Sequence, residues 1–274
     1  MRLRENAVLL LLAAIWGASF LVIKIGLRDV SPATLVLGRL IFAVLTLLVI
    51  AAIRPALIRG WWRFALLGML VGFVNNFLPF MLITWGETRI ASGVASIFNA
   101  TTPLFTVLLA HVWIGSAREP LTPRRGIGVL CGFLGVGVII GPGLLSLVDG
   151  SMNVIFGELA VLIAALSYGI GALLSRNFGG ASPLTPPLTM QVSALLFTVP
   201  VALLWEPPTQ LPSLRAIGAM AELGILATAV AYLLYFWLIR HVGATRTTLV
   251  TYLLPCTALI WGAALLSEPV TWND

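Results

Sequence analysis

The residues of this sequence that have the chemistry to bind a solute lie in the middle of long apolar runs. Ser92, Ser96, Asn99 and Pro103 are spaced at i, i+4, i+7 and i+11, which places them on one face of a helix. Unsatisfied polar groups are costly in lipid, so this face is expected to turn toward protein or a cavity. Serines also pack between helices. The two serines therefore fit either role, whereas the larger and more central Asn99 is predicted to face a cavity.

A similar stripe returns near the C-terminus, where Thr245, Thr248 and Tyr252 precede Pro255. The threonines again fit helix packing or a cavity. Tyr252 is large and central in its run, so we expect its side chain to face the cavity.

Two adjacent amides, Asn75 and Asn76, precede Pro79. Proline has no N–H, so Pro79 can free the carbonyl one turn earlier, at Asn75. Amides and a free carbonyl offer donors and acceptors to a zwitterion, or they satisfy a kink in the helix. Adjacent helical residues cannot both face one cavity squarely, so we expect one of the two amides to do so.

Aromatic residues at mid-depth complete the candidate site. Trp16 and Tyr168 stand 152 positions apart (168 − 16), an offset that recurs below, so we expect them to face each other. Rings can sandwich an apolar side chain or attract an ammonium group, and for each ring core packing is the alternative. The predicted substrate-binding residues are Trp16, Asn75, Asn76, Phe80, Asn99, Tyr168, Tyr232 and Tyr252.

Ionisable residues inside apolar runs are functional candidates, here Arg39, Glu158 and Glu222, with Lys24 nearer an end. We expect them in the outer half of the bilayer, where they pair with one another, line a vestibule or reach the interface. Glu222 is also a candidate to carry a coupling proton. A central cavity without charge suits a neutral or amphipathic solute.

The sequence favours neither catalysis nor metal binding. It has no mid-span histidine, no paired carboxylates and no cysteines at ligand spacing, since Cys131 and Cys256 each stand alone in an apolar run. We therefore predict no catalytic residues, no metal and no cofactor.

Composition defines the class of protein. Of the 274 residues, 59% are hydrophobic and 9% are charged, against about 25% charged in soluble domains. This predicts an all-α integral membrane protein in a lipid bilayer. The net charge of +6 comes from basic residues in short loops, which fits membrane orientation rather than nucleic-acid binding.

Nine apolar runs are long enough to span a bilayer. They lie at roughly 7–27, 33–53, 62–84, 91–114, 126–147, 154–176, 185–205, 215–239 and 245–266. Landmarks recur along them: Trp16-Gly17 matches Tyr168-Gly169, Pro103 matches Pro255, and Ser31-Pro32 matches Ser182-Pro183. Landmarks in one order at nearly the same offset, 151 or 152 positions, indicate an internal duplication.

The duplication predicts a ten-helix plan. Residues 1–150 hold five runs and residues 151–274 hold four, so we expect a tenth helix that is absent from this sequence and a longer natural chain. Five spans per copy orient the two copies oppositely, and inverted repeats are a transporter architecture. Most basic residues fall on one side if the N-terminus is cytoplasmic: Arg2, Arg4, Arg54, Arg59, Arg63, Arg118, Arg124, Arg125, Arg176, Arg240 and Arg246.

This pattern resembles the drug/metabolite transporter superfamily and its EamA-type exporters. The resemblance rests on the duplicated plan, on W-G-x-S-F at Trp16–Phe20, on the proline-centred run with its E-P-L-T end at 119–122, and on the Gly-rich run after Arg125. Within the superfamily the chain is most similar to YddG-type amino-acid exporters. The resemblance implies a monomer with a central cavity that moves amino acids, notably aromatic ones, out across the bacterial inner membrane.

The predicted function is therefore export of neutral amino acids and related small metabolites by alternating access. A multidrug or nucleotide-sugar carrier on the same scaffold is the alternative within transport. An intramembrane enzyme and a passive channel or scaffold are the alternatives from other classes.

Overall fold

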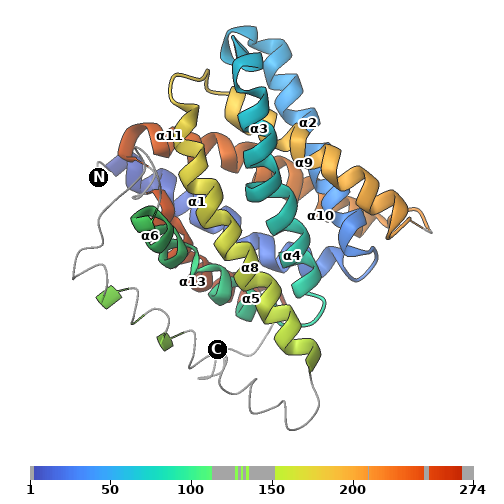
Figure 1. Cartoon of the computed structure of the whole chain (residues 1–274). Coiled ribbons are helices and arrows are strands. Elements are labelled where there is room, and N and C mark those ends of the chain that lie inside the picture. The colour runs from blue at the N-terminus through green and yellow to red at the C-terminus, as the bar shows by residue number, and fades with distance from the viewer. Residues whose placement is uncertain are drawn as a thin grey trace.

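The computed structural model describes residues 3–112, 127, 128, 131, 134, 135, 152–208, 210–243 and 247–266. Within these ranges every regular element is a helix, as the sequence predicts (Figure 1). The main helices are α1 (Leu3–Gly26), α2 (Pro32–Ile53), α3 (Ala65–Gly72), α4 (Leu78–Gly86), α5 (Ser92–Asn99), α6 (Thr102–Val112), α8 (Met152–Ser175), α9 (Thr185–Leu204), α10 (Leu214–Gly224), α11 (Ala231–Val242) and α13 (Leu254–Leu266).

Seven described stretches are long and apolar enough to cross a membrane, which confirms an all-α membrane protein. They are Leu3–Gly26, Pro32–Ile53, Pro55–Gly86, Ser92–Val112, Met152–Phe178, Thr185–Leu204 and Leu214–Val242. The predicted run 126–147 and both Glu-Pro motifs, at 119–120 and 268–269, lie largely or wholly outside the described residues. The last predicted run holds the 3-10 helix η7 (Thr248–Leu253) followed by α13.

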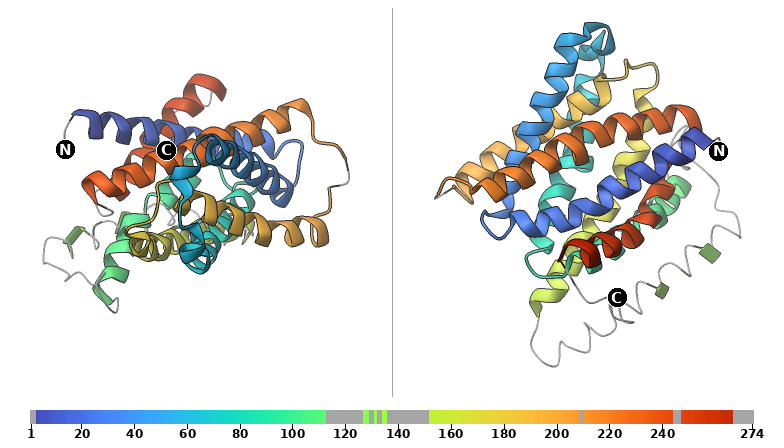
Figure 2. Two further views of the ribbon diagram at one scale, coloured as in Figure 1. Left: turned by 90° about the horizontal axis from the view of Figure 1, so that it is seen from above. Right: turned by 180° about the vertical axis from the view of Figure 1, so that it is seen from behind.

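The first helix of each half of the chain packs on helices of the other half. Helix α1 contacts α10, α11 and α13, and it lies beside α13 in the view from behind (Figure 2). Helix α8 contacts α4, α5 and α6. The second helices, α2 and α9, pack on each other. This reciprocal exchange brings residues far apart in the sequence to the centre of the molecule.

Two of the long helical stretches, Pro55–Gly86 and Leu214–Val242, each contain a short π-helix at corresponding positions of the two halves. The segment η3 (Phe73–Phe77) joins α3 to α4, and η6 (Ile225–Val230) joins α10 to α11. Their first residues are 152 positions apart (225 − 73), the same offset as Trp16 and Tyr168. A π-helix adds a residue to one turn and is frequent at functional sites. The two segments therefore extend the repeat that the sequence landmarks indicate.

Serine caps begin two helices and tie the loops at one end of the molecule. The side chain of Ser31 accepts the N–H of Thr34 at the start of α2, where Pro32 needs no hydrogen-bond partner. Ser213 accepts the N–H of Ala216 at the start of α10 and donates to Asp29 Oδ2 at 2.6 Å. The loop after α1 is thereby joined to the loop before α10.

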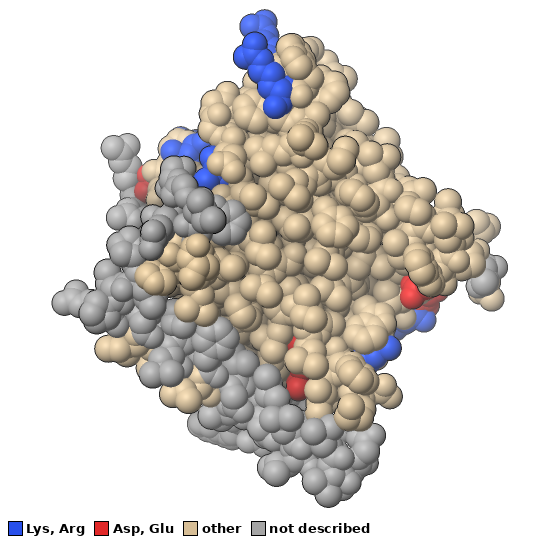
Figure 3. All heavy atoms as spheres, in the orientation of Figure 1, with Lys and Arg blue, Asp and Glu red and all other residues tan. Residues whose placement is uncertain are grey.

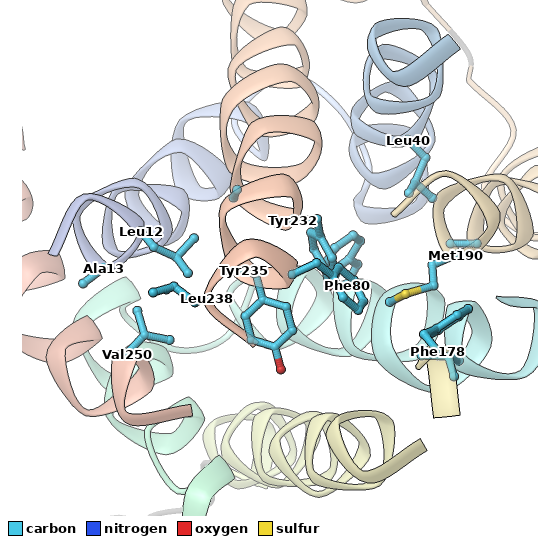
Figure 4. Close-up of a cluster of buried hydrophobic side chains, with 14 of the residues drawn as sticks. Leu12, Ala13, Leu40, Phe80, Phe178, Met190, Tyr232, Tyr235, Leu238 and Val250 are labelled. Carbon is cyan, nitrogen blue, oxygen red and sulfur yellow. The ribbon is translucent and has the colours of Figure 1, made fainter. Parts of the chain in front are cut away.

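Charge and apolar packing are distributed as a membrane requires. In Figure 3 uncharged side chains cover most of the face, and a group of Lys and Arg side chains stands over the connection between α2 and α3. Buried aromatic and aliphatic side chains from both halves meet in the core, among them Leu12, Phe80, Met190 and Tyr232 (Figure 4). The site described next lies beside this core.

Candidate functional site

A cavity lies between the two halves and is lined by most of the predicted binding residues. The space within it that is free of protein atoms is about 810 Å³, including the solvent-open space at its mouth. Helices α1, α2, α4, α5, α8, α11 and the η7–α13 region all contribute to its lining. The predicted residues in the lining are Trp16, Asn75, Phe80, Asn99, Tyr168 and Tyr232.

Trp16 is fixed in the cavity wall by the second half of the chain. Its indole N–H donates to the backbone carbonyl oxygen of Ala227 in η6 at 3.0 Å. Its ring lies 6.1 Å from that of Tyr232 and 5.6 Å from that of Tyr235, centroid to centroid. One edge of the indole is thus used for structure, while the residue as a whole lines the cavity.

The neighbouring Gly17 lets α13 approach α1 closely. A Cβ atom at Gly17 would lie 2.0 Å from Thr257 Oγ1, so no larger residue fits without movement. Thr257 Oγ1 donates to the carbonyl oxygen of Ala13 at 3.0 Å. The Trp16-Gly17 pair therefore combines a cavity residue with a contact point between helices.

Pro79 frees a carbonyl oxygen that a tyrosine from the other half then binds. Because proline lacks an N–H, Pro79 cannot supply the α-helical i+4 hydrogen bond to the carbonyl oxygen of Asn75. The hydroxyl of Tyr232 donates to this carbonyl oxygen at 3.1 Å and accepts from Asn75 Nδ2 at 3.2 Å. The carbonyl that Pro79 was expected to free therefore accepts a hydrogen bond from Tyr232.

Of the two adjacent amides, Asn75 lines the cavity and Asn76 does not. Asn76 is fully buried and is not among the residues that line the cavity. The prediction that one of the pair faces the cavity is met by Asn75. Asn99 also lines the cavity, and its Oδ1 is buried with no hydrogen-bond partner in the part of the chain that the structure describes.

The prediction that Tyr252 faces the cavity needs correction. Its side chain is 47% exposed on the outside of the helix, whereas Thr251 and Leu254 line the cavity. The prediction assumed α-helical spacing, but Thr248–Leu253 is a 3-10 helix. At three residues per turn, positions i and i+3 share a face. The residues of this region that line the cavity are Val250, Thr251 and Leu254, and Tyr252 is not among them.

Sequence reasoning also placed Arg39 away from the cavity, and this was wrong. Arg39 lines the cavity with Trp16 and Asn75, and only 6% of its surface is exposed. Its position eight residues into α2 suggested the outer half of the bilayer, where pairing, a vestibule or the interface was expected, and the structure shows its side chain in the cavity lining. The cavity thus contains a cation, contrary to the expectation of an uncharged site.

A buried carboxyl group lies within electrostatic range of this cation, at the end of α4. Glu87 is fully buried, and neither of its carboxylate oxygens has a hydrogen-bond partner among the described residues. Burial raises the pKa of Glu87 well above its usual value of 4.5, and the positive charges of Lys24 and Arg39 oppose that rise. Lys24 Nζ itself donates to the backbone carbonyl oxygens of Glu87 and Ile90.

Two comparisons with known sequences agree on the class of protein. The uncharacterized transporter YoaV of Bacillus subtilis is 24% identical over 273 residues, which cover 94% of this chain and 87% of the relative. The uncharacterized inner membrane transporter YedA of Escherichia coli K12 is 27% identical over 263 residues, covering 94% of this chain and 81% of YedA.

A solved structure matches the fold of this chain, and a family profile matches its sequence. A solved crystal structure superimposes with a TM-score of 0.73 at 16% identity, covering 100% of this chain and 92% of that chain. At 16% sequence identity, this match supports the fold alone. The sequence profile of the EamA-like transporter family matches residues 4–141 and 155–274. The chain is thus a multi-pass membrane transporter and belongs to the EamA-like transporter family.

Proposed function

We propose that this transporter exports neutral amino acids, with aromatic ones foremost, and related small metabolites across the bacterial inner membrane. The observation that carries the proposal is the cavity between the two halves, whose walls pair repeat-related residues. Trp16 and Tyr168 line it, as do Phe80 and Tyr232, which are also 152 positions apart (232 − 80). Transporters built from inverted repeats bind their solutes at such an interface.

The chemistry of the lining suits an amphipathic solute. Aromatic rings of Trp16, Phe80 and Tyr168 offer surface to an apolar side chain. Amides at Asn75 and Asn99 and the guanidinium of Arg39 offer hydrogen bonds in the same cavity. A free amino acid carries both kinds of group, whereas a purely apolar drug would leave the polar groups without partners.

The proposed mechanism is alternating access with two repeats, residues 1–150 and 151–274. Each repeat has its own π-helix, η3 and η6, and its first helix packs on the other repeat. Movement of one repeat against the other would open the cavity to either side in turn. The protein acts as a monomer in this scheme, and no chemical step or cofactor takes part.

The test is uptake of labelled phenylalanine into proteoliposomes by wild type, Trp16→Ala and a matched control, Trp62→Ala. Trp62 is 64% exposed and outside the cavity lining. We expect saturable uptake that other neutral amino acids inhibit, and an apparent KM raised about 10-fold or more in Trp16→Ala, since each tenfold corresponds to about 1.4 kcal/mol of binding. Trp62→Ala should match wild type.

The other outcomes separate the alternatives. Saturable uptake that Trp16→Ala leaves unchanged keeps the carrier and removes the proposed site. Absence of uptake for every amino acid, with folded and inserted protein, overturns amino-acid export and favours a drug or nucleotide-sugar carrier. Uptake that does not saturate indicates a channel.

A further inference from the structure

We propose that Arg39 binds the carboxylate of the transported solute, so that the substrates of this cavity are carboxylic acids rather than amines or uncharged molecules. The inference rests on the proposed function only in placing the substrate in the cavity described above. It adds the chemical class of the substrate and the residue that selects it. Three features of Arg39 carry the argument: how it is held, which of its atoms are free, and what balances its charge.

Arg39 is held in a fixed orientation by η6. Its Nε–H donates to Thr228 Oγ1 at 2.8 Å, and both residues are buried. The Thr228 hydroxyl in turn donates its proton to the carbonyl oxygen of Leu223 at 2.7 Å. That proton is committed, so Thr228 can only accept from Arg39. The guanidinium is therefore preorganised, which lowers the entropy cost of binding a ligand.

One face of the guanidinium is also covered. The central carbon of the group, Cζ, lies 3.6 Å from the centroid of the Phe80 ring, which is itself part of the cavity wall. Stacking of this kind fixes the plane of the group. With Nε bound to Thr228 and one face on Phe80, the two terminal nitrogens remain for a ligand. Neither has a hydrogen-bond partner within the described ranges.

The geometry of these two nitrogens matches a carboxylate. Their N–H groups point in parallel and bind both oxygens of a carboxylate or phosphate group at once. An ammonium group of a lysine in the same place would act as a point charge without that selection. Arg39 thus has the features expected of a carboxylate-binding residue: it is buried, its Nε is bound to Thr228, and its terminal nitrogens are available in the cavity lining.

The charge of Arg39 lacks a direct counter-ion in the described part of the chain. Glu87 and Glu222 act on it electrostatically, but neither forms an ion pair or hydrogen bond with it. An unpaired charge in a low-dielectric interior is costly. A carboxylate ligand would neutralise this charge on binding, whereas an amine would add a second positive charge to the cavity.

The cavity also holds an acceptor for the rest of the solute. Asn99 lines the cavity, and its Oδ1 is buried with no hydrogen-bond partner among the described residues. An acceptor of this kind suits an ammonium or hydroxyl group on the same molecule. Arg39 and Asn99 together fit a carboxylic acid that carries a hydrogen-bond donor, as α-amino and α-hydroxy acids do.

The experiment uses three competitors: phenylalanine, its carboxamide, which lacks only the carboxylate, and 3-phenylpropionate, which lacks only the amine. Each is tested against labelled phenylalanine uptake and, separately, for thermal stabilisation of the purified full chain. We expect phenylalanine and 3-phenylpropionate to compete and stabilise, and the carboxamide to be about 10-fold weaker or more, as the loss of a charged hydrogen bond implies.

Variants at Arg39 test the residue itself. In Arg39→Gln, acid and carboxamide should compete equally, and in Arg39→Lys the preference for the acid should be reduced. Arg89→Gln is the matched control, because Arg89 also stacks on a ring, that of Trp85 at 3.5 Å, but lies outside the cavity lining. It should keep the full preference for the acid.

The outcomes separate this inference from the proposed function. If wild type transports phenylalanine and the carboxamide competes equally, export stands and the role of Arg39 is overturned, whether or not Arg39→Gln folds. If no amino acid is transported but 3-phenylpropionate stabilises the wild type and not Arg39→Gln, the carboxylate site stands and amino-acid export fails. A wild type that responds to none of the three overturns both.

Discussion

Asn75 and Tyr232 bind each other through two hydrogen bonds that join the two halves of the chain. Asn75 Nδ2 donates to the tyrosine hydroxyl at 3.2 Å, and the hydroxyl donates to the Asn75 carbonyl oxygen at 3.1 Å. Because that carbonyl is left free by Pro79, the proline in one half and the tyrosine in the other form one unit. The unit lies in the cavity wall, so it couples the shape of the cavity to the packing of the halves.

Tyr232→Phe should therefore destabilise the protein. The change keeps the ring but leaves a buried carbonyl and a buried amide without partners, which costs about 1–3 kcal/mol. Tyr235→Phe is the matched control, since Tyr235 is on the same helix and in the same cavity lining but its hydroxyl has no hydrogen-bond partner among the described residues. In Figure 4 that hydroxyl points away from the Tyr232 ring.

Thermal unfolding in detergent, followed by tryptophan fluorescence, measures the difference. We expect a lower midpoint for Tyr232→Phe and a midpoint close to wild type for Tyr235→Phe. Equal midpoints for both variants would show that the bond between Asn75 and Tyr232 does not hold the halves together.

A second prediction concerns the contact between α10 and α2. A Cβ atom at Gly224 would lie 2.5 Å from the backbone carbonyl oxygen of Arg39 and 2.5 Å from Phe42 Cβ. Backbone cannot move aside as a flexible side chain does, so Gly224→Ala should cost about 1–3 kcal/mol through overpacking. Because α2 carries Arg39, the variant should also bind substrate more weakly.

Gly218 provides the control in the same helix, because a Cβ atom there meets nothing within 4 Å. Gly218→Ala should be neutral or stabilising by up to about 1 kcal/mol, as expected for alanine in place of glycine in a helix. The measurements are the unfolding midpoint and the KM for uptake. A Gly224→Ala protein as stable as Gly218→Ala would contradict the close contact between α10 and α2.

A third prediction is a pH-dependent stability caused by Glu87. Burial raises its pKa well above 4.5, against the opposing effect of Lys24 and Arg39. The folded protein therefore keeps this proton to a higher pH than the unfolded chain does. Stability contributed by the protonated group is full below about pH 4.5 and is lost as pH rises toward the folded-state pKa.

Glu87→Gln replaces the carboxyl group with a neutral group of similar shape and removes this dependence. We expect the variant to be more stable than wild type at pH 8, with the difference shrinking as the pH is lowered to 5. Unfolding midpoints of both proteins across that range provide the measurement. A difference that stays constant, or that grows on acidification, would mean that Glu87 is charged in the folded protein throughout.

Much of the fold could be predicted from the sequence, because a bilayer restricts both composition and length. Seven predicted spans correspond to described stretches that are long and apolar enough to cross a membrane, since an apolar run of the required length has few other structures open to it. The cavity residues Trp16, Asn75 and Tyr168 could be identified because polar or ring-bearing side chains at mid-span are unusual. The role of Pro79 followed from its missing N–H.

The errors have two physical causes, which are local geometry that departs from the α-helix and the reach of a long side chain. Tyr252 was placed by α-helical spacing, but a 3-10 segment turns Thr251 to the cavity instead. The sequence analysis did not predict the π-helices η3 and η6, and in η6 the Ala227 carbonyl oxygen accepts a hydrogen bond from the distant Trp16. Arg39 was judged by the depth of its backbone, whereas the length and direction of its side chain bring it into the cavity.

The last prediction concerns the orientation of the protein in the membrane, which depends on how its arginines are divided between its two ends. The connection between α2 and α3 meets the connection between α8 and α9 at one end, where Leu184 N–H donates to the Leu57 carbonyl at 3.0 Å and Ser182 donates to the Arg59 carbonyl at 3.0 Å. Arg240 donates to the Ala181 carbonyl at the same end. This end therefore collects arginines from several loops.

Acidic residues lie at the opposite end of the molecule, near the connections between α1 and α2 and between α9 and α10. There, Asp29 accepts from Ser213, and Glu206 accepts from the backbone N–H of Ala33. Since short loops rich in arginine stay in the cytoplasm, the end with the connection between α2 and α3 is predicted to be cytoplasmic, and the N-terminus with it.

Single cysteines at the two ends test this orientation in intact cells. In a background with Cys131→Ala and Cys256→Ala, Ala56→Cys places a thiol in the exposed connection between α2 and α3, and Leu211→Cys places one in the opposite loop, where the residue is 96% exposed. A membrane-impermeant maleimide should label Leu211→Cys in intact cells and Ala56→Cys only after permeabilisation. The reverse pattern would place the arginine-rich end outside, and labelling of both in intact cells would mean that charge does not fix a single orientation.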